Sequence, residues 1–318
     1  MDIEDFDEQL KKIEEKQKDA EENLGDVEIR DAILEKAQLY EKHSKNEKAV
    51  EIYKEALKKT IGIGKKMDVW FYIMSIYIRE KNLPKILETI DACKKLLEEG
   101  GDWERKNRLK IYEGIYNLLI RNLKKTSELF LDCISTFNYP DIISYQRIVK
   151  YTILTSIISI GRSEMKKKVI HNSEVLSTIR ELPDVKSLLD TYSKCDYKSF
   201  FISLTRVLDD LKTDEYLAPH RKFFTREIRI VIYSQFLESY KTVTLNSIAQ
   251  AFGVSVEFID KELSELISAG RLTCKIDKVQ GIVESERIDE RNNLYKTAVK
   301  QGDHLLNLVQ KLSRVIDI

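Results

Sequence analysis

The chain has 318 residues, which allows two or three domains and a sizeable core. It contains 11 glycines and 4 prolines, far below the usual roughly 7% and 5%, so long helices with few turns are expected. Lys+Arg and Asp+Glu both count 53, and this balance excludes a global charge bias toward a polyanionic partner.

The cysteines and the apolar runs indicate the compartment. Cys93, Cys133, Cys195 and Cys274 are isolated, with no CxxC pair, which favours reduced thiols over a disulfide framework. The longest apolar run, 151–160, is about half of what a membrane helix needs. We therefore expect a soluble intracellular protein of the cytoplasm and nucleus, with no membrane contact.

Residues 1–26 are strongly acidic, with eleven acidic and four basic side chains. Their apolar positions have the 3-4-3 spacing of an amphipathic helix: Ile3, Phe6, Leu10 and Ile13. A short helix that docks on another surface and a solvated, partly frayed terminus fit this pattern equally well.

Residues 27–196 are predicted to form a tetratricopeptide-like helical-repeat solenoid. Three similar breaks, at 45–49, 81–86 and 121–126, each separate an aromatic-rich helical run from a second amphipathic run. Equivalent lysines in the breaks, Lys48, Lys85 and Lys125, are 37 and then 40 residues apart. Such a hairpin cannot bury its apolar face alone, so the units are expected to stack. The aromatic side chains are interpreted as core packing between neighbouring helices.

Residues 197–286 are predicted to form a module with a winged helix at 225–285. The apolar periodicity shifts from helical to alternating along this stretch, and cap residues mark the ends of the elements. The expected order is a helix capped by Thr225, a β-favouring run at 241–244, a helix ended by Gly253, a helix between Ser255 and Gly270, and a β-hairpin over 272–285.

The charge of the predicted recognition helix argues against a nucleic-acid function. Glu257, Asp260, Glu262 and Glu265 stand there against a single lysine, Lys261. Duplex binding requires Lys and Arg to replace the counterions of the phosphates, so this helix would be repelled. We therefore expect the module to bind protein and not nucleic acid.

Residues 287–318 are predicted to form a terminal helix that follows a charged hinge at 286–289. Gly302 is expected to interrupt this helix. Its apolar positions have near-heptad spacing, which indicates a seam that needs a partner surface: Leu294, Ala298, Leu305, Leu308, Val309, Leu312 and Ile316.

No sequence pattern supports an enzyme, a cofactor or a metal site. The four histidines are scattered, with no HxH or HExxH pair: His43, His171, His220 and His304. The segment 62–66 resembles a phosphate loop, but Lys59 and Lys66 stand where a Walker motif needs Gly and Ser or Thr. Residues 161–165 lack the second glycine of a nucleophile elbow.

The order of helical hairpins, winged helix and terminal helix resembles the PCI domain. Over roughly the last hundred residues, the amino-acid sequence of several blocks is similar to that of PCI-domain subunits of the proteasome lid. The blocks are 220–230 (HRKFFTREIRI), 235–240, 251–260, 270–284, 300–307 and 310–316. The chain is expected to be shorter at its N-terminus than typical members.

The resemblance implies an all-α scaffold of the regulatory particle. Its winged helix would associate side by side with those of other PCI subunits, and its terminal helix would join a bundle. Catalysis, including deubiquitination, would reside on neighbouring lid subunits, and a contact with the ATPase ring is a further expectation. Four residues would flank an exposed sheet edge of the winged helix: Leu272, Ile276, Val279 and Ile282. A PCI subunit of the signalosome or of translation initiation factor three is the alternative, and a nucleic-acid-binding winged helix is a distant third.

Overall fold

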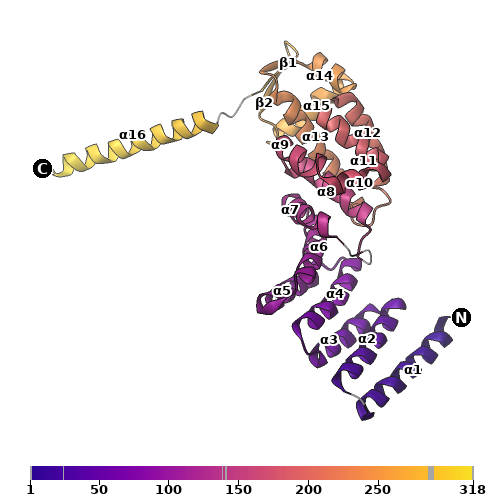
Figure 1. Ribbon diagram of the computed structural model, residues 1–318. Coiled ribbons are helices and arrows are strands. Elements are labelled where there is room, and N and C mark those ends of the chain that lie inside the picture. Colours follow the sequence, from indigo (N-terminus) through magenta and orange to yellow (C-terminus); the bar gives the residue numbers. More distant parts are fainter. Residues whose placement is uncertain (1, 24, 138, 140–141, 286–289, 317–318) are drawn as a thin grey trace. The chain divides into compact units, whose positions relative to one another are not determined.

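The computed structural model describes every residue except 1, 24, 138, 140–141, 286–289 and 317–318. The described part is largely helical and contains one small antiparallel sheet (Figure 1). The first helices are α1 (Asp2–Asn23), α2 (Asp26–Lys42), α3 (Asn46–Lys59), α4 (Ile63–Arg79), α5 (Leu83–Gly100), α6 (Trp103–Leu119) and α7 (Leu123–Cys133). Next come η1 (Ile134–Thr136), α8 (Tyr145–Ser159), α9 (Arg162–Met165), the π-helical turn η2 (Lys166–Ile170), α10 (Ser173–Thr178), η3 (Ile179–Glu181), α11 (Pro183–Lys194), α12 (Tyr197–Asp210) and η4 (Ala218–His220). The chain ends with α13 (Arg221–Glu238), β1 (Thr242–Thr244), α14 (Leu245–Phe252), α15 (Val256–Ser268), β2 (Cys274–Asp277), β3 (Ile282–Ser285) and α16 (Glu290–Ile316).

The chain divides into two compact units. The first comprises residues 1–195 and 203–222, and the second comprises 196–202 and 223–318. The predicted class, a helical-repeat array followed by a winged helix and a terminal helix, is confirmed. The finer division into 1–26, 27–196, 197–286 and 287–318 stays a prediction. None of the described helices combines the length and the apolarity that a membrane crossing requires.

In the first unit, successive helices pack as hairpins, α2 with α3, α4 with α5 and α6 with α7 (Figure 1). Each predicted break begins in the turn of a hairpin and continues into the first turn of the following helix. Each turn is closed by a non-glycine residue in the left-handed region: Ser44 (φ 57°), Lys81 (φ 56°) and Arg121 (φ 64°). Asn82 and Asn122 then begin the next helix, because their side chains accept hydrogen bonds from the backbone N–H groups of Lys85 and Lys125.

Aromatic side chains fill the space between these hairpins. Tyr53 stacks on Tyr72 with ring centroids 5.6 Å apart, and Phe71 stacks on Tyr112 at 5.4 Å. The Tyr53 hydroxyl donates to Glu41 over 3.0 Å, and burial raises the pKa of this hydroxyl, so it remains a donor. Tyr53, Phe71 and Tyr112 are buried, as the interpretation of the aromatic positions as core predicts, whereas Tyr72 is half-buried.

The N-terminal segment forms a helix that packs on α2. Glu14 of α1 accepts from Lys36 at 3.0 Å, and Lys16 pairs with Glu35 at 3.2 Å. Of the two alternatives for residues 1–26, the structure shows the docked helix. The side chains of Ile3 and Phe6 lie outside the described residues.

Gly114 allows α6 and α7 to approach closely. A Cβ atom at this position would lie 2.8 Å from Phe130 Cδ1 and nearer still to a second ring atom. Phe130 is fully buried, so its ring has little room to move away. Alanine therefore fits poorly at this position, although it is the better helix former.

We expect Gly114→Ala to lower the free energy of unfolding by about 1–2 kcal/mol, because the overlap outweighs alanine's helix propensity. Urea denaturation followed by circular dichroism measures this. Gly302→Ala is the matched control, since a Cβ at Gly302 meets nothing within 4 Å, and it should cost no stability. A Gly114→Ala protein as stable as the parent would contradict the packing described.

One buried carboxylate holds the segment between α12 and α13. Asp214 accepts from the Tyr151 hydroxyl at 2.6 Å and from the backbone N–H groups of Tyr216 and Leu217 at 3.1 and 3.2 Å. Its second oxygen lies 3.9 Å from Lys150 Nζ. Burial, reinforced by the hydrogen bond to Asp214, raises the pKa of Tyr151, so the hydroxyl stays protonated. The carboxylate is thus compensated although only 4% of its side chain is exposed.

The end of the same segment contacts a hairpin turn. Arg121 Nε donates to His220 Nδ1 over 3.0 Å, which requires that nitrogen to be unprotonated. Burial, followed by the charges of Arg121 and Lys81, lowers the pKa of His220 below its ordinary 6.5. The folded unit therefore resists protonation of this ring.

This pKa shift predicts a loss of stability in mild acid. Below about pH 6.5 the unfolded chain takes up the proton that folded His220 refuses. The stability that neutral His220 contributes to the folded state is complete above about pH 6.5. It declines as the pH falls toward the lowered pKa of His220 in the folded protein. Urea midpoints at pH 7.5 and 5.5 should therefore fall further in the parent than in His220→Gln. Equal losses in the two proteins would contradict the role given to His220.

Two predicted helix boundaries are wrong. Helix α13 begins at Arg221 and not after Thr225, because the turn η4 leads directly into helical backbone. Helix α16 runs through Gly302 without interruption, since one glycine costs a helix only about 1 kcal/mol. The predicted hinge at 286–289 lies outside the described residues.

Candidate interaction surfaces

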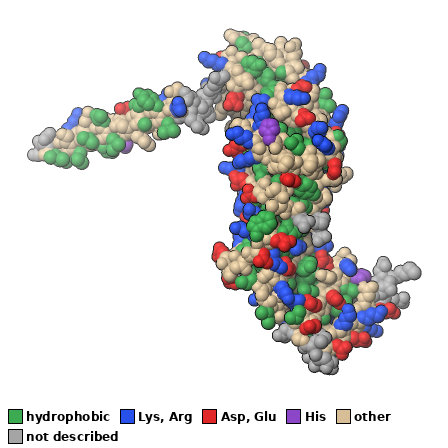
Figure 2. Space-filling view, viewed as in Figure 1, with side chains coloured by type: hydrophobic (Ala, Val, Ile, Leu, Met, Phe, Trp, Pro, Cys, Tyr) green, Lys and Arg blue, Asp and Glu red, His purple; other side chains and the backbone are tan. Residues whose placement is uncertain are grey.

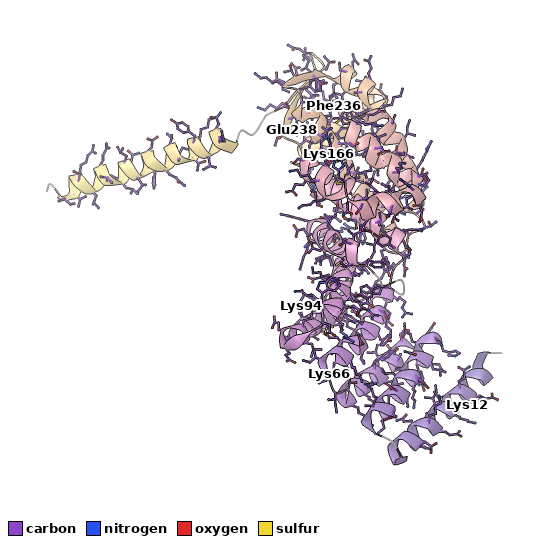
Figure 3. The ribbon with its side chains drawn as sticks, in the orientation of Figure 1. Lys12, Lys66, Lys94, Lys166, Phe236 and Glu238 are labelled. Carbon is purple, nitrogen blue, oxygen red and sulfur yellow. The ribbon has the colours of Figure 1, made fainter. Side chains whose placement is uncertain are left out.

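The second unit is built around Phe252 at the end of α14. Tyr197 and Phe201 of α12 and Tyr233 and Phe236 of α13 surround it, with ring centroids 5.1–5.3 Å away. Figure 3 labels Phe236 on α13. Gly253 follows with φ 67° and ends α14, as its backbone freedom predicts. This cluster fixes α14 against α12 and α13.

Helix α15 is oriented by an acidic side chain that faces inward. Ser255 caps the helix by accepting from Phe258 N. Glu262 accepts from the Tyr233 hydroxyl at 2.5 Å and from Arg229 at 2.9 Å. Burial and then the hydrogen bond to Glu262 raise the pKa of Tyr233, so the phenol stays a donor. The outward face of α15 keeps exposed Glu257 and Glu265, in keeping with the charge argument made from the sequence.

The sheet has the strand order β1-β3-β2, and both pairs are antiparallel. Thr244 of β1 and Asp277 of β2 both lie opposite Ile282 of β3. The backbone of β3 is therefore paired on both sides. The open edges belong to β1 and β2, whose outward N–H and C=O groups have no strand partner among the described residues.

The four residues predicted at the sheet edge lie in different environments. Leu272 precedes β2 and is 6% exposed, so it packs within its own module. Ile276 is half-buried on the edge strand β2, whereas Ile282 is half-buried on the central strand. Val279 is 96% exposed in the turn between β2 and β3. The geometry thus leaves Ile276 and Val279 beside an open edge.

The turn that carries Val279 is stabilised by its own sequence. Asp277 Oδ1 accepts from the backbone N–H groups of Val279 and Gln280 at 2.9 and 3.2 Å. Gly281 follows with φ 65°, a conformation that glycine adopts without strain. An apolar side chain is therefore held outward at the tip of the wing.

Helix α16 carries more exposed large hydrophobic side chains than any other described element. All seven residues predicted for the helical seam are exposed, and Leu305 and Leu312 are 62% and 63% accessible. Hydrophobic side chains gather along this helix in Figure 2. A second set of exposed apolar positions was not predicted from the sequence: Tyr295, Val299, Leu306 and Val315.

The two sets together form a broad apolar sector. At 100° per residue they span roughly 200° of the circumference of α16. The remaining sector is polar and includes Lys300, Asp303, Asn307, Gln310 and Lys311. Tyr295, Val299 and Leu306 each follow a residue of the first seam, and Val315 precedes one, a signal that a strict heptad search overlooks.

Residues typical of metal or catalytic sites do not cluster in the described part of the chain. No group of three or more His, Cys, Asp and Glu residues there is placed to hold a metal ion. Cys93, Cys133 and Cys274 are buried, and burial raises the pKa of the Cys93 thiol to about 12.

A helical array that leads into a winged helix with open sheet edges defines a PCI-type scaffold protein. Comparison with known families agrees: the PCI domain profile matches residues 204–287. The profile of 26S proteasome subunit RPN7 matches residues 3–168, and that of the 26S proteasome regulatory subunit RPN7/PSMD6 C-terminal helix matches 295–316. The chain belongs to the 26S proteasome subunit RPN7 family.

Curated relatives are similar over almost the whole chain. The 26S proteasome non-ATPase regulatory subunit 6 homolog of Arabidopsis thaliana is 50% identical, with 98% of this chain and 80% of the relative covered. The 26S proteasome non-ATPase regulatory subunit 6 of Oryza sativa subsp. japonica is 48% identical at the same coverage. The COP9 signalosome complex subunit 1 of Arabidopsis thaliana is more distant, at 28% identity over 62% of this chain and 45% of the relative.

Proposed function

We propose that this chain is a non-catalytic scaffold subunit in the lid of the 26S proteasome regulatory particle. It organises lid assembly for ubiquitin-dependent protein degradation. Its partners are other PCI-domain lid subunits and the lid deubiquitinase subunits, with a further contact to the ATPase ring. Its place of action is the cytoplasm and nucleus. Similarity to named proteasome subunits over nearly the whole chain supports this proposal.

The observation that carries the scaffold role is the exposed apolar sector of α16. A solvated helix of this length gains little from propensity alone, and most helical stability in proteins comes from packing. Burying one of its leucines contributes about 1.5–3 kcal/mol. A sector of roughly 200° is wider than a two-stranded coiled-coil seam requires. It therefore fits a bundle in which several partner helices surround α16.

The winged helix supplies a second surface. The outer edges of β1 and β2 offer backbone groups that strand addition by a neighbouring module can pair. Ile276 and Val279 lie beside the β2 edge and would give that contact its apolar side chains. Leu272 and Ile282 would support the module from within, as their places in the fold suggest.

Affinity purification tests which complex contains the chain. A tagged chain expressed at its natural level should recover proteasome lid subunits in constant proportion. Recovery of signalosome or translation initiation factor three subunits in their place would overturn the assignment. The lower identity and coverage of the signalosome relative favour the proteasome.

A further inference from the structure

A groove in the first unit is lined by the first helices of three successive hairpins. Its volume is about 750 Å³, and its walls come from α2, α4 and α6, with residues 215–216 also contributing. Tyr72 and Tyr112 give it aromatic sides, and Ile78 adds an apolar one. The groove shares no residue with α16 or with the sheet edges. It is called the inner groove below.

The charges along the inner groove do not balance. Five charged side chains line it: Glu41, Lys42, Arg79, Arg108 and Glu215. Glu41 forms an ion pair with Arg79, and Glu215 lies 3.8 Å from Arg147. Lys42 and Arg108 belong to none of the ion pairs found among the described residues. Both acids are thus compensated, and two cations are left over.

Arg108 is held in place without being neutralised. Its guanidinium carbon lies 4.9 Å from the centroid of the Phe71 ring and 5.8 Å from that of Tyr139. Rings attract the faces of a guanidinium, whereas its N–H donors point along its edges. The buried Nε has no hydrogen-bond acceptor within the described part of the chain. The guanidinium has no acidic partner among the described residues, which favours an anionic acceptor at its remaining N–H groups.

We propose that the inner groove binds an extended segment of another protein through a single side-chain carboxylate, which pairs with Arg108. The planar guanidinium can engage both oxygens of a carboxylate in parallel hydrogen bonds. Tyr72, whose side chain is half-buried, contacts a residue beside the carboxylate. A run of acidic residues fits poorly, because it would bring more negative charges than the two cations left over can pair.

Defined peptide libraries test the proposal on the full chain without any other subunit. Heptapeptides with both ends blocked carry a central Glu or a central Gln, with Ala, Leu, Ser or Tyr at the other positions. The immobilised chain is incubated with equal mixtures, and retained peptides are quantified by mass spectrometry. We expect about tenfold or greater preference for Glu over Gln, the effect of a charge-assisted pair.

Substitutions test whether the inner groove causes the preference for Glu over Gln. Arg108→Gln should abolish the preference for Glu over Gln. Arg108→Lys keeps the charge but cannot donate two parallel hydrogen bonds, so it should leave a reduced preference. Lys106→Gln is the matched control on α6, since Lys106 is exposed and does not line the groove. Circular dichroism checks that each variant is folded. Lys42→Gln, at an exposed position, should lower the preference severalfold and decides the matter if Arg108→Gln does not fold.

Two further libraries distinguish the source of the carboxylate. One has a central Gln and a free C-terminus, and the other has Glu at the three central positions. Both should be retained less well than the single-Glu library. Equal retention of the Glu and Gln libraries, or retention of neither, would overturn the proposal. So would a Glu preference that survives in Arg108→Gln, or better binding of either further library.

Discussion

Leu305→Asp combined with Leu312→Asp should abolish incorporation of the chain into the regulatory particle. Both side chains are exposed in the free chain, so the substitutions remove no internal contact and the isolated protein should fold normally. In a bundle each leucine would contribute about 1.5–3 kcal/mol. Losing both contributions weakens association at least about 100-fold, and burying aspartates weakens it further. Density-gradient sedimentation of tagged chains in extract measures the assembled fraction.

The matched control places the same charges on the polar sector of α16. Asn307→Asp combined with Gln310→Asp also adds two negative charges to the helix. This variant should assemble like the parent, because its side chains would face away from the bundle. If both double variants assembled, or both failed, the apolar sector would not be what holds the chain in the complex.

Asp214→Ala is expected to produce the largest loss of stability, about 3–5 kcal/mol in the free energy of unfolding. The substitution removes the acceptor for the Tyr151 hydroxyl and for two backbone N–H groups. It also leaves Lys150, 8% exposed, with Asp210 as its remaining acidic neighbour at 2.5 Å. Urea denaturation of the isolated chain is the measurement.

Two variants separate burial from charge in this cluster. Asp209→Ala removes an exposed carboxylate that pairs with Lys212, and it should leave stability nearly unchanged because solvent screens the pair. Tyr151→Phe removes only the hydroxyl and should cost about 1–3 kcal/mol. An Asp214→Ala protein no less stable than Asp209→Ala would show that the buried carboxylate does not hold this segment.

Local chemistry made the winged helix and the hairpin turns predictable. Gly253, Ser255 and Gly270 mark the helix ends through cap geometry that depends on neighbouring residues alone. The repeated Asn82 and Asn122 likewise begin helices after a left-handed residue. The seam of α16 followed from periodicity, because an exposed helix has no tertiary context to alter its pattern.

Features that depend on distant partners could not be predicted. The alternation of Leu272 and Ile276 does not reveal that β3 is the central strand, because β1 comes from thirty residues upstream. The start of α13 was missed because the preceding turn η4 supplies helical backbone before the cap-like Thr225. The inner groove joins α2, α4 and α6, which no local pattern connects. Arg108 therefore had no signal in the sequence.

Hydrogen exchange along α16 tests most directly the central claim that this chain acts by offering surfaces to other chains. We expect the amides of 290–316 to exchange rapidly in the isolated protein and at least about 100-fold more slowly in the purified regulatory particle, where packing would block opening. Equal protection in the two states would contradict the claim, since the helix would then be covered by its own chain or by nothing at all.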